Sequence, residues 1–423
     1  MRQGRRGDVP ALRALALLGA LLAPAPVRAQ MTGPVPARPF RLSLSYTADC
    51  VRVARGGRAG DTCLGNGRVG LTADLARAGL TGTHLFLEGL VDHGGAPSDL
   101  VGDLQGVDNI EAPHAARLYE AWIEHVSASG WSVLAGFYDL NSEFDVADAP
   151  SVFVNSSFGV SAGLGLSGRR GPSIFPTTSL GVRLRVAPTP DSYAQMAVLD
   201  GVPARVANGL PPIRLGGGEG ALVVLEGGIV GGAPGGRMPG VPRAQMRRRR
   251  VDLADGETPT GRKLALGAWG YTGWLPRADA VSTGRMVHGS FGAYALGETW
   301  LYREARDASR GARAYAELGW TAGRADPVRF FAGAAVAYTG MPRADDELGL
   351  GLAMAAASRP YRNAFLDAPP RSGRAETVLE LTWRRGVAGR LFIQPDIQLV
   401  FGPLADPAVR RALLAGLRVE VAL

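Results

Sequence analysis

The residues of this sequence that could act on or bind a polar molecule are charged side chains spread between positions 111 and 185. Four carboxylic acids open this stretch: Glu111, Glu120, Glu124 and Asp139. Two carboxyl groups at a fixed separation can hydrolyse a glycosidic bond, one as an acid and the other as a base or nucleophile. No feature of the sequence selects such a pair. A secreted carbohydrate-active protein therefore stays open as an alternative, and no catalytic residue is assigned.

Motifs for other chemistries are missing from the sequence. It has no Gly-x-Ser-x-Gly elbow, His-Glu-x-x-His pair, Walker loop or dinucleotide fingerprint in its required context. The histidines are scattered without metal-ligand spacing, so the sequence predicts neither a metal nor another cofactor. The basic run at 247–250 reads as a solvated loop, because nucleic-acid binding would need basic residues clustered with aromatics on one face.

The charged residues belong to segments in which polar and apolar residues alternate with a period of two, as in a β-strand with two different faces. In 391–401 every odd-numbered residue is apolar, whereas Gln394, Asp396 and Gln398 occupy even positions. Arg183 and Arg185 alternate in the same way with leucines and valines. The segments 69–75, 375–383 and 417–423 repeat the pattern.

These alternating segments predict an all-β fold, a transmembrane antiparallel β-barrel. A soluble sandwich would also alternate, but here the polar face is repeatedly charged, as a water-filled lumen requires, and the apolar face continues to the last residue. After residue 29 no window approaches about 18 uninterrupted apolar residues, so helical membrane spans are excluded. Several aromatic residues lie near the strand ends and are candidates for interfacial girdles: Trp269, Tyr271, Trp274, Trp300, Tyr302, Trp320, Tyr338 and Trp383.

The first 29 residues are typical of a secretory signal peptide. Arginines at 2, 5 and 6 precede a short apolar stretch at 14–25, and Val27-Arg28-Ala29 resembles a small-residue cleavage site. The formal charge of +8 is therefore partly a property of this segment. We expect residues 30–423 to form the barrel, with 30–65 as a candidate periplasmic or plug-like N-terminal segment.

Cys50 and Cys63 are the only cysteines. Because both lie in the exported part of the chain, we expect them to form a disulfide that staples the structure and has no chemical role. A metal site is the alternative, and it lacks the usual spacing and neighbouring histidines.

Several stretches resemble one known family. They read VGDLQGVDNIEAPHAARLYEAWIEH from residue 101, GFYDLNSEFDVADAPSVFVNSSFG from 136 and VLELTWRRGVAGRLFIQPDIQLVFGP from 378, and DLNSEF and QPDIQ are the most specific parts. On these residues the chain resembles the carbohydrate-selective porin family of the OprB type, from about Tyr46 to the C-terminus. The chain departs from the family in ending on Leu423 rather than an aromatic residue.

The resemblance implies a monomeric barrel of 16 strands in the bacterial outer membrane, surrounded by its lipid, that lets sugars or other small hydrophilic solutes diffuse passively. Strand parity places four candidates in the lumen: Glu120, Glu124, Arg183 and Arg185. Glu111 and Arg117 lie at the entry to the strand of the two glutamates and could reach a constriction. Each could equally be an ordinary solvated lumen residue. A barrel with an adhesion or assembly role would share the same alternation.

Overall fold

The computed structural model describes residues 39–189, 191–213, 216, 218–231, 261–366 and 374–423. The expected signal peptide at 1–29 and the basic run at 247–250 lie outside the described residues. Within the described ranges no helix is long and apolar enough to cross a membrane.

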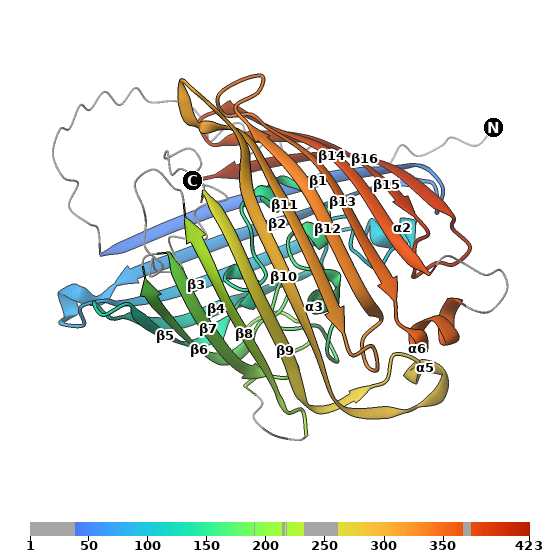
Figure 1. Cartoon of the computed structure of the whole chain (residues 1–423), viewed down its shortest axis with the longest axis horizontal. Coiled ribbons are helices and arrows are strands. Elements are labelled where there is room, and N and C mark those ends of the chain that lie inside the picture. The colour runs from blue at the N-terminus through green and yellow to red at the C-terminus, as the bar shows by residue number, and fades with distance from the viewer. Residues whose placement is uncertain (1–38, 190, 214–215, 217, 232–260, 367–373) are drawn as a thin grey trace, which may run out of the picture. The chain divides into compact units, whose positions relative to one another are not determined.

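Sixteen antiparallel strands form one sheet in which each strand pairs with its neighbours in sequence and β1 pairs with β16, so the sheet closes into a barrel (Figure 1). This confirms the predicted all-β barrel. The strands are β1 (Phe40–Arg55), β2 (Gly60–Asp74), β3 (Thr83–Gly94), β4 (Ala115–Val126), β5 (Trp131–Tyr138), β6 (Ser179–Thr189), β7 (Ser192–Asp200), β8 (Ala221–Gly231), β9 (Arg262–Pro276), β10 (Met286–Glu304), β11 (Asp307–Thr321), β12 (Val328–Thr339), β13 (Glu347–Ala357), β14 (Ala375–Ala388), β15 (Leu391–Phe401) and β16 (Arg411–Ala422).

The suggestion of a plug-like segment at 30–65 does not hold for residues 40–65. These residues are β1 and the first part of β2, and both strands belong to the barrel wall. The cause lies in the pairing: β1 forms a continuous ladder with β2 on one side and with β16 on the other, which leaves no free segment to fold into the lumen.

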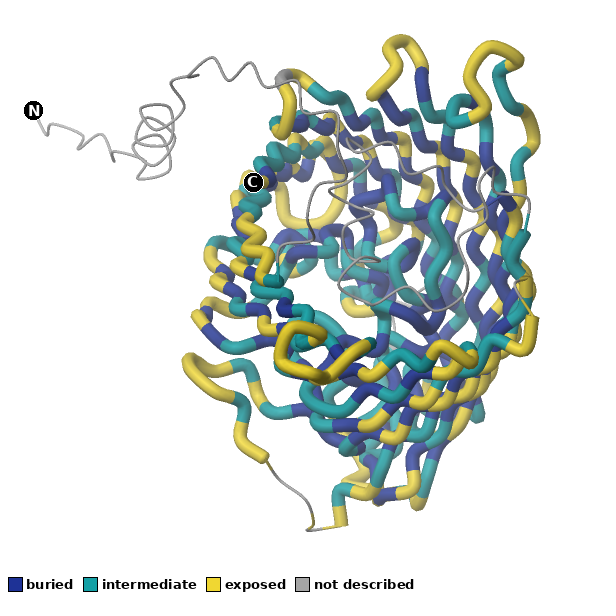
Figure 2. Tube along the Cα trace, turned by 90° about the vertical axis from the view of Figure 1, so that its left-hand side faces the viewer, coloured by how far each residue is buried: buried dark blue, intermediate teal, exposed yellow. Residues whose placement is uncertain are grey.

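The two faces of the wall follow the predicted parity, and exposed and buried residues alternate along the strands (Figure 2). On β15, Ile397 is 50% exposed on the outer face, whereas Gln394 and Gln398 are buried inside. On β14, Leu379 and Leu381 point outward and Glu380 points inward. The outer face is therefore the apolar one, as contact with lipid requires.

The aromatic residues divide between the two faces. Trp274 and Trp320 are exposed on the outer wall, as expected of girdle residues. Trp269 and Tyr271 are instead buried in the cluster that fills part of the lumen. Strand parity decides the difference, because Trp269 and Tyr271 occupy the odd, inward positions of β9 and Trp274 an even one.

Within the described residues, the helical segments of the connections are short, and some of the connections fold into the barrel. The helical segments are η1 (Leu75–Ala78), α2 (Ser98–Val101), η2 (Leu140–Ser142), η3 (Ala149–Val152), η4 (Ser156–Phe158), α3 (Ala162–Gly165), α5 (Ala280–Thr283), α6 (Arg359–Tyr361) and the π-helical η7 (Arg362–Leu366). Segments η2, η3, η4 and α3 all belong to the connection 139–178 between β5 and β6, whose η3 and α3 contact the inner wall at β11 to β13.

The inner wall at β13 is built to receive this connection. The rings of Phe153 and Phe158 stack with centroids 4.3 Å apart. They lie over glycines of β13: a Cβ atom on Gly351 would lie 2.6 Å from Phe158 Cζ, and one on Gly349 would lie 3.0 Å from Phe153 Cε1. Any larger side chain at these glycines would push the connection off the wall, since protein interiors leave little free space.

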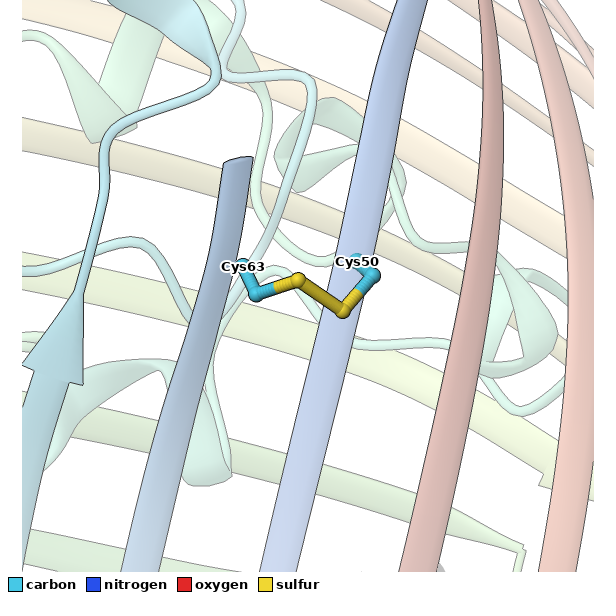
Figure 3. The surroundings of a disulfide bond; sticks show 2 residues. All are labelled: Cys50 and Cys63. Atoms are coloured by element: carbon cyan, nitrogen blue, oxygen red, sulfur yellow. A yellow bond between two sulfur atoms is a disulfide. The ribbon is translucent and has the colours of Figure 1, made fainter. Parts of the chain in front are cut away.

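Cys50 and Cys63 form the expected disulfide, with their Cα atoms 4.1 Å apart on the directly paired positions of β1 and β2 (Figure 3). Both residues are exposed, so the bond lies on the outer face of the wall. It cross-links two strands that the ladder already joins.

We expect reduction of this disulfide to weaken the protein without opening the barrel. The cross-link spans 13 residues, and closing a loop of this size stabilises by at most about 3 kcal/mol, much of which the β1–β2 ladder already supplies. Thiol labelling should therefore require reductant, while heat-modifiable migration on a gel persists after reduction. Labelling of both cysteines without reductant would contradict the presence of the Cys50–Cys63 disulfide.

Candidate functional site: the lumen and its two inward-folded connections

Two connections, 95–114 and 139–178, fold inward and are held by carboxylates of the wall. Glu380 accepts hydrogen bonds from the backbone N–H groups of Val154 and Asn155, at 2.6 and 3.0 Å. Glu298 Oε2 accepts from the N–H groups of Asp148 and Ala149, both at 2.9 Å. Each buried carboxylate thus satisfies two backbone donors that would otherwise lack a partner.

The connection 95–114 is held in the same way. Glu376 accepts from the backbone N–H groups of Leu104 and Gln105, each at 2.9 Å. Gln398 Nε2 donates to the carbonyl of Val107 at 2.8 Å, and its Oε1 accepts from Asn155 of the other connection at 3.2 Å. One side chain therefore ties both connections to the wall.

Burial shifts the ionisation of acids within these connections. The pKa of Asp108 is raised by desolvation and by the nearby charge of Asp49, and the pKa of Asp145 is raised mainly by desolvation. The pKa of Glu111 is also raised by burial, and its Oε2 accepts from the backbone N–H of Ser98 at 3.0 Å. These acids fix the turns of the connections.

The structure brings two of the lumen candidates, Glu124 and Arg183, into direct contact. Arg183 Nη2 lies 2.5 Å from Glu124 Oε1, and Arg183 Nε lies 2.8 Å from Glu143 Oε2 in the connection 139–178. The side chains of all three are 1 to 2% exposed. Glu120 is also buried and accepts from the N–H of Asp139. These residues face inward but are covered by the connection.

The remaining sequence-predicted candidates lie elsewhere on the wall. Arg117 Nη2 lies 2.5 Å from Asp92 Oδ2, and Arg117 Nε donates to the carbonyl of Pro176 at 2.9 Å. Arg185 is partly exposed, with its guanidinium 4.7 Å from the ring centroid of Tyr193. Of the six candidates, Arg183 and Glu124 thus share an ion-paired group with Glu143, and Glu120 binds the backbone of Asp139. Arg117 pairs with Asp92, while Arg185 and Glu111 lie apart from both groups.

The sequence did not reveal a row of polar side chains on β16, β1, β2 and β3, here called the polar track. It consists of Arg418, Asp49, Asn66, Arg68, Glu88 and Asp92. Arg68 has a side chain 28% exposed, 3.4 Å from Glu88 and with its guanidinium 5.7 Å from the ring centroid of Phe175. Asn66 lies two residues along β2 and donates to Asp92 at 2.5 Å. Parity alone put Arg68 on the inner face. The contact of its guanidinium with the ring of Phe175 could not be predicted in this way, because Phe175 belongs to the distant connection 139–178.

Further along the same track, Arg418 of β16 binds Asp49 of β1 through three hydrogen bonds of 2.6 to 3.0 Å. It also lies 3.4 Å from Asp108 Oδ1. Donors and acceptors thus alternate along this side of the wall. Arg68 is the most exposed of these polar side chains, since Asp49, Asn66 and Asp92 are 2 to 3% exposed. Among the described residues, no group of three or more His, Cys, Asp or Glu side chains could hold a metal ion.

A closed barrel with an apolar outer face and a charged lumen narrowed by inward-folded connections defines a transmembrane channel of the porin class. The family model described as carbohydrate-selective porin, OprB family, matches residues 58–423. The chain therefore belongs to the OprB family, which confirms the resemblance seen in its sequence. It is a porin of the bacterial outer membrane for small hydrophilic solutes, carbohydrates in particular.

Solved structures of other channels share the fold. The high-pH structure of Pseudomonas putida OprB is similar with a TM-score of 0.74 and 17% identity, over 91% of this chain and 94% of that one. The outer-membrane channel DcaP of Acinetobacter baumannii is similar with a TM-score of 0.52 and 10% identity, over 91% of this chain and 97% of that one. No curated protein sequence matches the chain.

Proposed function

We propose that this porin passes small sugars along the polar track of β16, β1, β2 and β3, that it does so as a monomer, and that it performs no chemistry on them. The observation that carries the proposal is Arg68, a partly exposed guanidinium held against aromatic rings beside the carboxylate of Glu88. An aromatic face with a charged hydrogen-bonding group at its edge suits a sugar ring, which has apolar C–H faces and a hydroxyl rim.

Weak binding is what such a channel requires, since a solute held tightly would not leave. Arg68 is already engaged with Glu88 and with Asn66, whose Oδ1 accepts from Arg68 Nε at 2.8 Å. A hydroxyl group therefore exchanges with existing partners rather than filling an empty site. This exchange keeps the net gain small.

For the six residues selected from the sequence, we propose a positioning role. Arg183, Glu124 and Glu120 hold the start of the connection 139–178 against β4 and β6. They would thereby help to set the width of the bore without being exposed in it. This role also argues against the glycosidase alternative, because the carboxylates of Glu120 and Glu124 are occupied by structural partners. An adhesion or assembly barrel would differ in lacking solute-dependent conductance.

Neutralising Arg68 should weaken the passage of sugars without loosening the wall. We expect Arg68→Gln to reduce glucose binding, read from glucose block of single-channel current, about three- to tenfold, the effect of losing one hydrogen bond of about 1 kcal/mol. Ion preference should move toward cations, because fixed positive charge in a lumen favours anions.

The matched control is Arg77→Gln, an exposed arginine outside the lumen in the turn between β2 and β3. It should change neither glucose block nor the reversal potential in a salt gradient. Equal glucose block and equal reversal potential in the two variants would show that Arg68 does not contact the solute. The molar mass of the protein in detergent, measured by light scattering, should be that of a monomer. Sugars incubated with the porin should remain unmodified, and the loss of any of them would contradict the proposal.

A further inference from the structure

One rim of the barrel, where β9 is connected to β10 and β11 to β12, has three exposed arginines. The two connections contain no exposed acid. Arg285 and Arg324 lie in the connections 277–285 and 322–327, and Arg329 follows at the start of β12. The acids of these connections are turned inward: Asp279 is 7% exposed and pairs with Arg277, and Asp326 is 1% exposed. The surface therefore has a net positive charge.

Backbone contacts hold these arginines on one continuous surface. The N–H of Arg277 donates to the carbonyl of Arg285 at 3.0 Å, and the N–H of Ala278 donates to the carbonyl of Arg324 at 2.9 Å. Arg324 directly follows Gly323, where an added Cβ atom would lie 3.0 Å from Arg329 Cδ. The three side chains thus start from neighbouring backbone rather than from separate parts of the rim.

An apolar aromatic surface lies next to this basic rim on the outer wall. Phe291 and Trp320 are 58% and 40% exposed, and their ring centroids are 5.7 Å apart. Arg329 connects the two surfaces, because its guanidinium lies 4.6 Å from the ring centroid of Trp320. Leu318, two residues further along β11, is 56% exposed and continues the apolar surface toward the middle of the wall.

We propose that this surface, formed by Arg285, Arg324, Arg329, Trp320 and Phe291, binds the phosphorylated headgroup of a glycolipid of the outer leaflet. Guanidinium groups bind phosphate through paired hydrogen bonds, and aromatic residues at the end of an apolar band lie at headgroup level. Charge complementarity thus selects an anionic headgroup. The neighbouring apolar wall accommodates its acyl chains.

The position of the surface on the barrel fits that leaflet. Strands alternate in direction, so the connections 277–285 and 322–327 lie at the same rim as the long connections 95–114, 139–178 and 201–220. The connections of the opposite rim are short apart from 232–261. In barrels of this class the longer connections face the cell exterior. The surface also faces outward from the wall, so a soluble anion crossing the lumen would not meet it.

The test is binding of bisphosphorylated lipid A to the folded full-length protein in detergent, measured by native mass spectrometry. The variant R285Q/R324Q/R329Q should bind it about a hundredfold more weakly, since each basic residue near an anionic lipid surface contributes about fivefold. Fully dephosphorylated lipid A should bind weakly to both proteins. R329K keeps the charge but loses the planar stack on Trp320, and an intermediate loss is expected.

The matched control is R77Q/R306Q/R390Q, three exposed arginines in turns at the opposite rim. It has the same change in net charge and should bind lipid A as the unmodified protein does. Equal affinities of the two triple variants, or equal binding of phosphorylated and dephosphorylated lipid, would overturn the proposal. If the triple variant fails to fold, R324Q alone should show the fivefold loss. Glucose block of single-channel current should be unchanged in all variants.

Discussion

Replacing Glu298 and Glu380 together by alanine is expected to raise single-channel conductance severalfold and to abolish discrimination between small and large sugars. The two carboxylates accept four backbone N–H groups of the connection 139–178. Each buried donor left without a partner costs about 1 to 3 kcal/mol, so the connection should detach from the wall. Planar-bilayer conductance and liposome swelling with mono- and trisaccharides measure the two effects.

The barrel itself should survive this change, because its closure depends on the strand ladder and not on the connection. Heat-modifiable migration on a gel should therefore be retained. Glu420→Ala is the matched control: Glu420 lies on β16, 3.5 Å from Arg384 of the wall. A folded double variant whose conductance equals that of this control would show that the connection does not define the bore.

The second large effect is expected on the outer wall. Arginine at Ile397, which is 50% exposed near the middle of β15, should lower the free energy of unfolding by about 2 to 4 kcal/mol, the cost of a charge near the middle of the bilayer. Chemical denaturation in phospholipid vesicles measures it. The same substitution in the lumen avoids lipid and should have little effect.

Thr72→Arg is the suitable lumen control, since Thr72 is a partly exposed residue of β2 that pairs with the inward-facing Phe86. Gln398, next to Ile397, would be a poor control because it binds both inward-folded connections. Equal losses at Ile397 and Thr72 would contradict the assignment of the two faces.

The wall was predictable because its signal is local. A period of two along 391–401 and 375–383 assigns each residue to a face, and the structure follows that parity at Ile397, Gln398 and Glu380. The motif DLNSEF identified the family although the chain is only 17% identical to Pseudomonas putida OprB. Local alternation and one specific motif were therefore enough to predict the class of channel.

The arrangement within the lumen was not predictable, because it depends on contacts between distant residues. Arg183 and Glu124 have the parity of bore residues, yet they are covered because Glu143 in the connection 139–178 folds over them. Gly351 reads as an ordinary strand glycine, and its use becomes evident only when Phe158 lies over it. A single sequence contains no periodic signal for such pairs.

The pairing of β1 with β16 has a consequence for how the protein is made. Arg418 and Asp49, bound across that seam, are 369 positions apart, so the wall keeps two unpaired edges until its last strand has been synthesised and exported. Unpaired backbone groups are not tolerated in lipid. A chain cut short before residue 411 would lack β16 and leave the edges of β1 and β15 unpaired, so we expect it not to insert as a barrel.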